Sequence, residues 1–251
     1  MQNIHYAYSL RQVGKGWNLE DRKAYFTWLS EAVKKSGGLS YRGHIEAIRE
    51  DAIAHLSPEE AKAVSWLLGE VAVDLSELPT AKGPGKTWTA EELTKLFKDP
   101  LEGRDLKNGE KMFAAGRCTV CHRIKGSGGY SGPDLGSVGS RYSIADIAAS
   151  IIKPSQTISE QYQASNIKLK SGDQLYGRII YQNKDTVAFA PSAFNPSQIQ
   201  KIPANEVASI EPSNLSMMPE GLINAMNEDE VRDLFAYMIS GGNPAHKVFK
   251  K

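Results

Sequence analysis

The 251-residue sequence has almost no excess of charge, because 30 basic and 29 acidic side chains leave a formal net charge of +1. A nucleic-acid binder or a polybasic membrane-surface protein needs a large one-sided charge, so both classes are disfavoured. No uninterrupted apolar run approaches the roughly 18 residues of a membrane helix. The N-terminal segment MQNIHYAYSL lacks the basic and then apolar layout of a secretory signal. If the protein works outside the cytoplasm, we therefore expect this chain to be a mature or excised piece.

The remaining composition, 41% apolar and 24% charged, is typical of a globular protein with one or two compact units. Apolar residues at helical spacing predict a helical domain over residues 1–76, with a helix start at Ser57-Pro58-Glu59-Glu60. Proline, glycine and threonine in residues 77–90 then predict a linker or a surface wrap, and residues 77–99 are expected to connect the two parts of the chain. Further helical segments follow in residues 100–240, and residues 241–251 are expected to form a C-terminal tail.

From about residue 160 the apolar period changes from helical to alternating. Four or five short strands within residues 160–212 predict a small antiparallel, barrel-like β insertion in an otherwise helical domain. We therefore expect a mainly α chain. Because its turns suggest a self-contained unit, we expect that a short linker could replace the insertion without loss of the functional site.

The chemistry is concentrated in Cys118-Thr-Val-Cys121-His122, which holds the only two cysteines of the chain. Cys-x-x-Cys-His is the attachment sequence of a c-type haem. The two thiols add to the haem vinyl groups, and the adjacent histidine becomes the proximal iron ligand. A structural zinc site is disfavoured because no third cysteine exists. A thioredoxin-like dithiol would follow a strand, whereas a helix precedes this motif.

Several segments around this motif resemble a class I cytochrome c domain. They are Gly109–Phe113, Gly132–Leu135, Met218-Pro219 and the closing helix at Val231–Tyr237. More narrowly, residues 100–240 resemble the haem-binding domain typical of planctomycetes and verrucomicrobia, on the evidence of Arg141, Lys153-Pro154-Ser155, the Ser-Gly-Asp β segment and Ser216–Leu222. In that family the domain commonly follows a dehydrogenase-like propeller and a helical-repeat region. The resemblance thus implies that this chain is the C-terminal piece of a longer polypeptide.

The resemblance also implies which residues bind the cofactor. The carbonyl of Pro133 would fix the ring of His122. Arg141 is the favoured partner of a haem propionate, whereas Tyr142, Tyr130 and Trp88 are candidates that fit ordinary surface or rim residues at least as well. For the distal ligand, Met1 is terminal, and Met112, Met226 and Met238 fit helices as core residues. Met217 and Met218 therefore stay open. Met218 is favoured, because it directly precedes Pro219 as the ligand does in the family pattern.

These residues predict one-electron transfer by a single covalent haem c with His122 and Met218 as axial ligands, and no enzymatic activity of the domain itself. By resemblance, the electron donor would be a fused or partner dehydrogenase, and the location periplasmic or otherwise extracytoplasmic. Two alternatives remain. A haem enzyme or gas sensor is expected if neither methionine binds iron, and a structural or interaction protein if haem is absent.

Overall fold

The N-terminal part of the chain folds into four helices: α1 (Gln2–Leu10), α2 (Leu19–Ala32), α3 (Gly38–Ile53) and α4 (Pro58–Leu68). The structure, a computed structural model, describes residues 2–32, 38–68, 75–99, 101–129, 131–195 and 198–250. The predicted start of α4 is confirmed, because Ser57 and Glu60 exchange side-chain to backbone hydrogen bonds. Residues such as Phe26, Leu29 and Ile45 fill a core between these helices.

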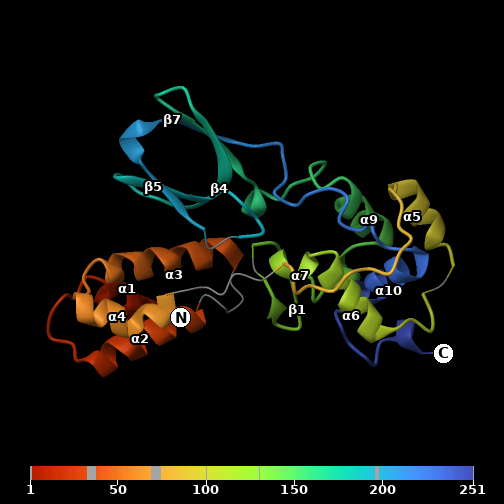
Figure 1. Cartoon of the computed structure of the whole chain (residues 1–251), viewed down its shortest axis with the longest axis horizontal. Helices are drawn as coiled ribbons and strands as arrows, with labels where there is room; N and C mark the ends of the chain where they lie inside the picture. Colours follow the sequence, from red (N-terminus) through yellow and green to blue (C-terminus); the bar gives the residue numbers. More distant parts are fainter. Residues whose placement is uncertain are drawn as a thin grey trace.

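The C-terminal part forms a second helical group, seen at the right of Figure 1. It contains α5 (Ala90–Leu96), α6 (Leu106–Ala115), α7 (Cys118–Cys121), α8 (Val138–Arg141), α9 (Ile144–Ile152), α10 (Glu228–Ile239), the 3-10 helix η3 (Lys247–Phe249) and the short strands β1 (Arg123–Ile124) and β2 (Ser127–Gly128). Helices α6 and α10 cross at Gly109, where a Cβ would meet the carbonyl oxygen of Asp233 and lie 2.8 Å from Cβ of Tyr237. Only glycine allows this close approach.

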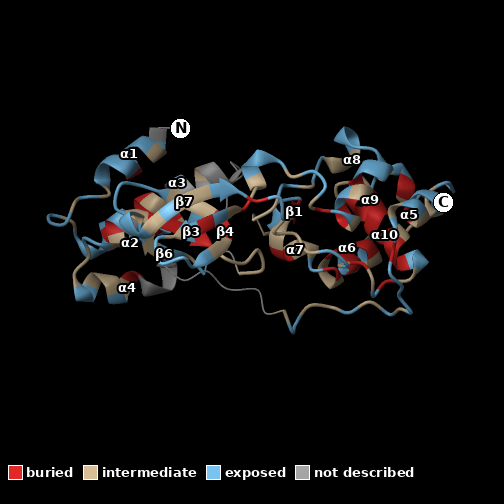
Figure 2. Ribbon diagram, turned by 90° about the horizontal axis from the view of Figure 1, so that it is seen from above, coloured by how far each residue is buried: buried red, intermediate tan, exposed pale blue. Residues whose placement is uncertain are grey.

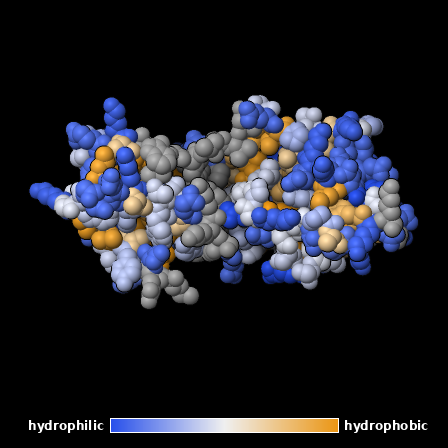
Figure 3. All heavy atoms as spheres, turned by 90° about the horizontal axis from the view of Figure 1, so that it is seen from below, coloured by the Kyte–Doolittle hydropathy of each residue, from blue (hydrophilic) through white to orange (hydrophobic). Residues whose placement is uncertain are grey.

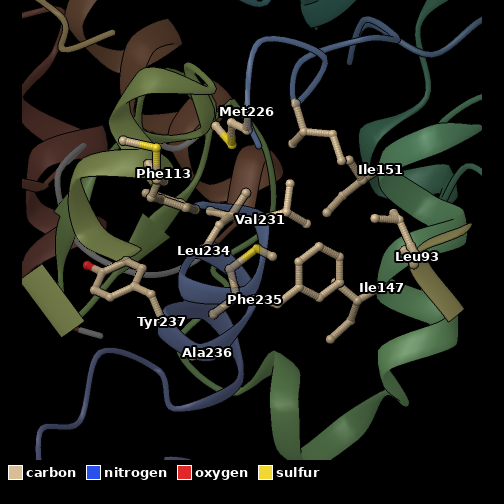
Figure 4. Packing of buried hydrophobic residues seen from close by; sticks show 14 of the residues in the cluster. Leu93, Phe113, Ile147, Ile151, Met226, Val231, Leu234, Phe235, Ala236 and Tyr237 are labelled. Atoms are coloured by element: carbon tan, nitrogen blue, oxygen red, sulfur yellow. The ribbon is translucent and has the colours of Figure 1, made fainter. Parts of the chain in front are cut away.

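The core of this group gathers around α10. Figure 4 shows Leu234, Phe235 and Val231 of α10 between Phe113 of α6 and Ile147 of α9. Figure 2 shows the buried residues of α6, α9 and α10 at one end of the molecule, away from those of α2 at the other. The two helical groups therefore have separate hydrophobic cores.

The segment expected to be a linker is packed onto the second core. Trp88 and Leu93 are buried there, and the backbone N–H groups of Lys82 and Gly83 donate to the carboxylate of Glu230. The expected C-terminal tail also contributes Val248, which is buried in the same core. Residues from both ends of the C-terminal part thus help to build its helical group.

Between α9 and α10 the chain forms a five-stranded antiparallel sheet with the order β6-β5-β4-β3-β7. Its strands are β3 (Ser165–Leu169), β4 (Gln174–Gln182), β5 (Thr186–Ala190), β6 (Gln200–Pro203) and β7 (Val207–Pro212), with the 3-10 helices η1 (Glu160–Tyr162) before it and η2 (Ala204–Glu206) before β7. Helix α3 packs against β4 and η1, so the N-terminal helices adjoin the sheet (Figure 1).

The expectation of a mainly α chain is wrong. The structure is 42% helical and 15% strand, and the sheet is a substantial part of the fold. The strands themselves were predicted, but their share of the chain was underestimated, because the alternating residues pair into one five-stranded sheet. Among the described residues, no helix combines the length and the apolar character needed to cross a membrane.

Candidate functional site

The two cysteines lie on the single helical turn α7, directly after α6. Arg117 before it adopts a left-handed conformation with φ of 59°, which redirects the chain between the two helices. The N–H of His122 donates to the carbonyl of Cys118 at 2.8 Å and closes the turn. Both thiols are half-buried, and side chains three residues apart on a helical turn point to the same side.

The surroundings of the two thiols keep them protonated at neutral pH. Burial, together with the neighbouring Cys121, raises the pKa of the Cys118 thiol to about 12. Burial also raises the pKa of Cys121, against opposing effects of Ser131 and Arg178. A redox dithiol needs a lowered thiol pKa, so this environment does not favour that alternative.

The ring of His122 is held in one orientation. Its Nδ1 lies 2.9 Å from the carbonyl oxygen of Pro133. Because a carbonyl can only accept a hydrogen bond, Nδ1 carries the proton and Nε2 keeps its lone pair. Burial lowers the pKa of His122, opposed by the hydrogen bond to Pro133, and this favours the neutral ring. A neutral imidazole with a free Nε2 is the form that binds a metal.

Glycines let the following loop run close to this ring. A Cβ on Gly132 would lie 2.6 Å from Cε1 of His122, so the backbone itself lies against the imidazole. The N–H of Gly132 donates to the carbonyl of Cys121 at 2.8 Å, and a Cβ on Gly129 would overlap the carbonyl of Val120. The loop therefore fits α7 and the histidine ring only with glycine at these positions.

The two candidate distal ligands lie in the loop between β7 and α10, and both are half-buried. Met218 packs against the C-terminal core, and its N–H donates to Oγ of Ser216 at 3.1 Å. The N–H of Ser216 in turn donates to Oγ of Ser155, just after α9. The loop that carries Met218 is thus attached to the helical group. Met217 is not among the described residues that pack against that core.

The other methionines and the propionate candidates have defined places. Met112, Met226 and Met238 are buried in the core, as predicted. Arg141 is exposed at the end of α8, with its guanidinium 5.8 Å from the ring centre of Tyr142. The indole N–H of the buried Trp88 donates to the carbonyl of Met226 at 3.2 Å. Tyr130 lies outside the described residues.

A cavity of about 650 Å³ opens beside the methionine loop. It is lined by residues of three segments: Thr87 and Trp88; Ile152, Lys153, Ser155 and Gln156; and Glu220, Gly221 and Asn224. Neither His122 nor either cysteine lines it, so this cavity is separate from the attachment turn.

Sequence reasoning missed one part of the site, which comes from the β insertion. The thiol of Cys121 donates to the carbonyl of Ala193 at 3.3 Å, and Arg178 of β4 donates to the carbonyl of Ser131 at 2.6 Å. The insertion is therefore in contact with the attachment turn, unlike the self-contained appendage that its turns predict. No local signal marks Arg178, because a single arginine in an alternating strand is an ordinary surface residue in sequence.

Residues 106–202, less than half of the chain, match the family model of cytochrome c. This segment begins with α6, includes the attachment turn and His122, and ends within β6, before the methionine loop. No curated protein matches the chain. The match supports the resemblance to class I cytochrome c at the level of the family. That family suggests haem-based electron transfer with covalently bound haem c, a redox partner and, typically, an extracytoplasmic location.

Proposed function

We propose that this chain transfers single electrons through one covalently attached c-type haem. The observation that carries the proposal is the arrangement at His122, whose Nδ1 is held by Pro133 beside two half-buried free thiols. This donor set fits a haem c, because it offers two thiols for attachment and one oriented imidazole. When bound, the haem supplies an iron that alternates between the ferric and ferrous states.

Each residue of the site would have its own role in binding the haem. Cys118 and Cys121 would attach it, and His122 would bind the iron through Nε2. Met218 would be the second axial ligand, because its loop is tied to Ser155 and its side chain packs against the core. A thioether favours ferrous iron relative to a second imidazole, so this ligand would raise the reduction potential. Arg141 would pair with a propionate at the surface.

Around this site we propose a domain over residues 100–240 with the insertion 160–212, of the type typical of planctomycetes and verrucomicrobia. Residues 1–76 would form a preceding helical domain, residues 77–99 a connecting segment and residues 241–251 a tail. The electron donor would be a fused or partner dehydrogenase, and the protein would work in the periplasm or elsewhere outside the cytoplasm. The domain itself would catalyse no substrate reaction.

The test is to produce the chain with c-type haem maturation machinery and to record its visible spectrum. Acid and organic extraction should leave one haem on each chain, whereas the double variant Cys118→Ala, Cys121→Ala should release it. Stoichiometric zinc without haem would refute the proposal. Rapid binding of carbon monoxide by the ferrous protein would instead indicate an open sixth position, as in a haem enzyme or gas sensor.

A further inference from the structure

One buried arginine of the β insertion joins three separate segments of the chain. Arg178 lies on β4 and is only 6% exposed. Its Nη1 donates to the carbonyl of Ser131 at 2.6 Å, and its Nη2 donates to the carbonyl of Gln161 at 3.1 Å. The guanidinium carbon lies 5.1 Å from the ring centre of Tyr162. The planar guanidinium, with its several fixed donors, thus bonds two carbonyls at once in a geometry that the compact ammonium of a lysine does not match.

The carbonyl that Arg178 binds most closely belongs to the loop that orients the histidine. Ser131 directly precedes Gly132, whose backbone lies against the ring of His122, and Pro133 follows. A second contact from the insertion reaches the same loop, because the hydroxyl of Ser131 donates to the carbonyl of Ala193 at 3.2 Å. The loop is therefore held by α7 on one side and by the β insertion on the other.

On the face shown in Figure 3 hydrophilic residues predominate, and the hydrophobic ones lie in separate patches. Among the described residues, nothing beside the exposed apolar side chains of the N-terminal helices, such as Tyr6 and Leu19, identifies a partner. Arg178, in contrast, donates to the loop whose backbone lies against His122, the candidate iron ligand.

We infer that Arg178 is a positioning residue for His122: it fixes the Ser131 carbonyl and thereby the Gly132–Pro133 backbone that orients the imidazole. The β insertion would then help to orient the iron ligand of the haem site. The role toward the haem rests on the proposed function. A buried positive charge beside the site would also favour ferrous over ferric iron, because the reduced centre carries one positive charge less.

The test compares Arg178→Met with Lys168→Met in the full chain. Lys168 lies on β3 of the same sheet and is exposed, so the control removes an equal charge without touching the loop. A hydrogen bond from a charged donor contributes about 1.5–3 kcal/mol, so amide hydrogen exchange at Gly132 should become about tenfold faster or more in Arg178→Met. Exchange in α10 should stay unchanged, which would show that the helical core is intact.

In the haem-loaded protein, Arg178→Met should also lower the reduction potential and alter the paramagnetically shifted NMR signals of the His122 ring. A residue that only stabilised the sheet would leave the signals of the His122 ring unchanged. Arg178→Lys keeps the charge without the planar fork, so we expect faster exchange at Gly132 with a potential closer to that of the wild type. If Arg178→Met does not fold, this lysine variant decides the question by the same two measurements.

The inference is overturned if Arg178→Met and Lys168→Met show the same exchange at Gly132 and the same potential. A wild-type chain that takes up no haem would refute the proposed function instead. In that case exchange at Gly132 in the unloaded chain still tests whether Arg178 holds the loop, because all of these contacts are made by the protein alone.

Discussion

Replacing Gly132 by alanine should disturb the ligand His122 through a single added methyl group. The new Cβ would lie 2.6 Å from Cε1 and 2.8 Å from Nδ1 of the ring. Carbon atoms in ordinary contact lie about 3.5–4.0 Å apart, so the ring or the loop must move by about 1 Å. Such a movement breaks the 2.9 Å contact between Nδ1 and the carbonyl of Pro133. Overpacking of this kind typically costs about 1–3 kcal/mol of unfolding free energy.

The measurement is denaturant unfolding of the haem-loaded protein, followed by its visible spectrum, together with its reduction potential. Gly14→Ala is the matched control, because the nearest atoms to a Cβ there lie 3.9 Å away, in His55. Gly132→Ala should unfold at lower denaturant concentration and show a changed potential, whereas Gly14→Ala should match the wild type. If both variants behave like the wild type, the close packing of loop and ring does not determine the ligand geometry.

Three further predictions test the distal ligand, the core and the N-terminal helices. Met218→Ala should lower the reduction potential and abolish the weak near-infrared band of a methionine bound to ferric iron, whereas Met217→Ala should keep the band; the reverse result would move the ligand by one residue. Leu234→Ala, at a position with 0% exposure, should lower the free energy of unfolding by about 2–5 kcal/mol. Leu215→Ala, at 58% exposure, should change it by about 0.5 kcal/mol or less, and equal losses would contradict the assigned core. The backbone N–H of Ser57 and the buried Arg22, whose Nε lies 2.9 Å from Oε1 of Glu60, both donate to the carboxylate of Glu60 and lower its pKa from 4.5. The stabilising effect of this ion pair should be present at neutral pH and be lost as the pH falls below 4.5 toward the lowered value. Chemical unfolding followed by tryptophan fluorescence should therefore show Glu60→Gln less stable than the wild type at pH 7 and nearly equal in acid, and a difference independent of pH would argue against this ion pair.

The sequence by itself determined the features that depend on neighbours along the chain. The attachment motif fits within five residues, from Cys118 to His122, so no fold is needed to identify it. The helix start at Ser57 is equally local, because its capping partner Glu60 lies three residues away. Met217 and Met218, in contrast, are adjacent and chemically identical, so the sequence favours Met218 only through the following Pro219, and the choice between them stays a prediction.

The tertiary structure decided which distant segments meet. Arg178 and Ser131 are 47 residues apart, and Lys82 and Glu230 are 148 apart, yet each pair is hydrogen-bonded. Propensity and periodicity describe one element at a time. They therefore predicted the strands but not that the sheet contacts α3 and the loop beside His122. The same limit applies to the β insertion and to residues 77–99, whose contacts with the helical group could not be predicted from the sequence. Contacts between separated segments are set by packing and by the need to satisfy buried polar groups, and both exist only once the chain has folded.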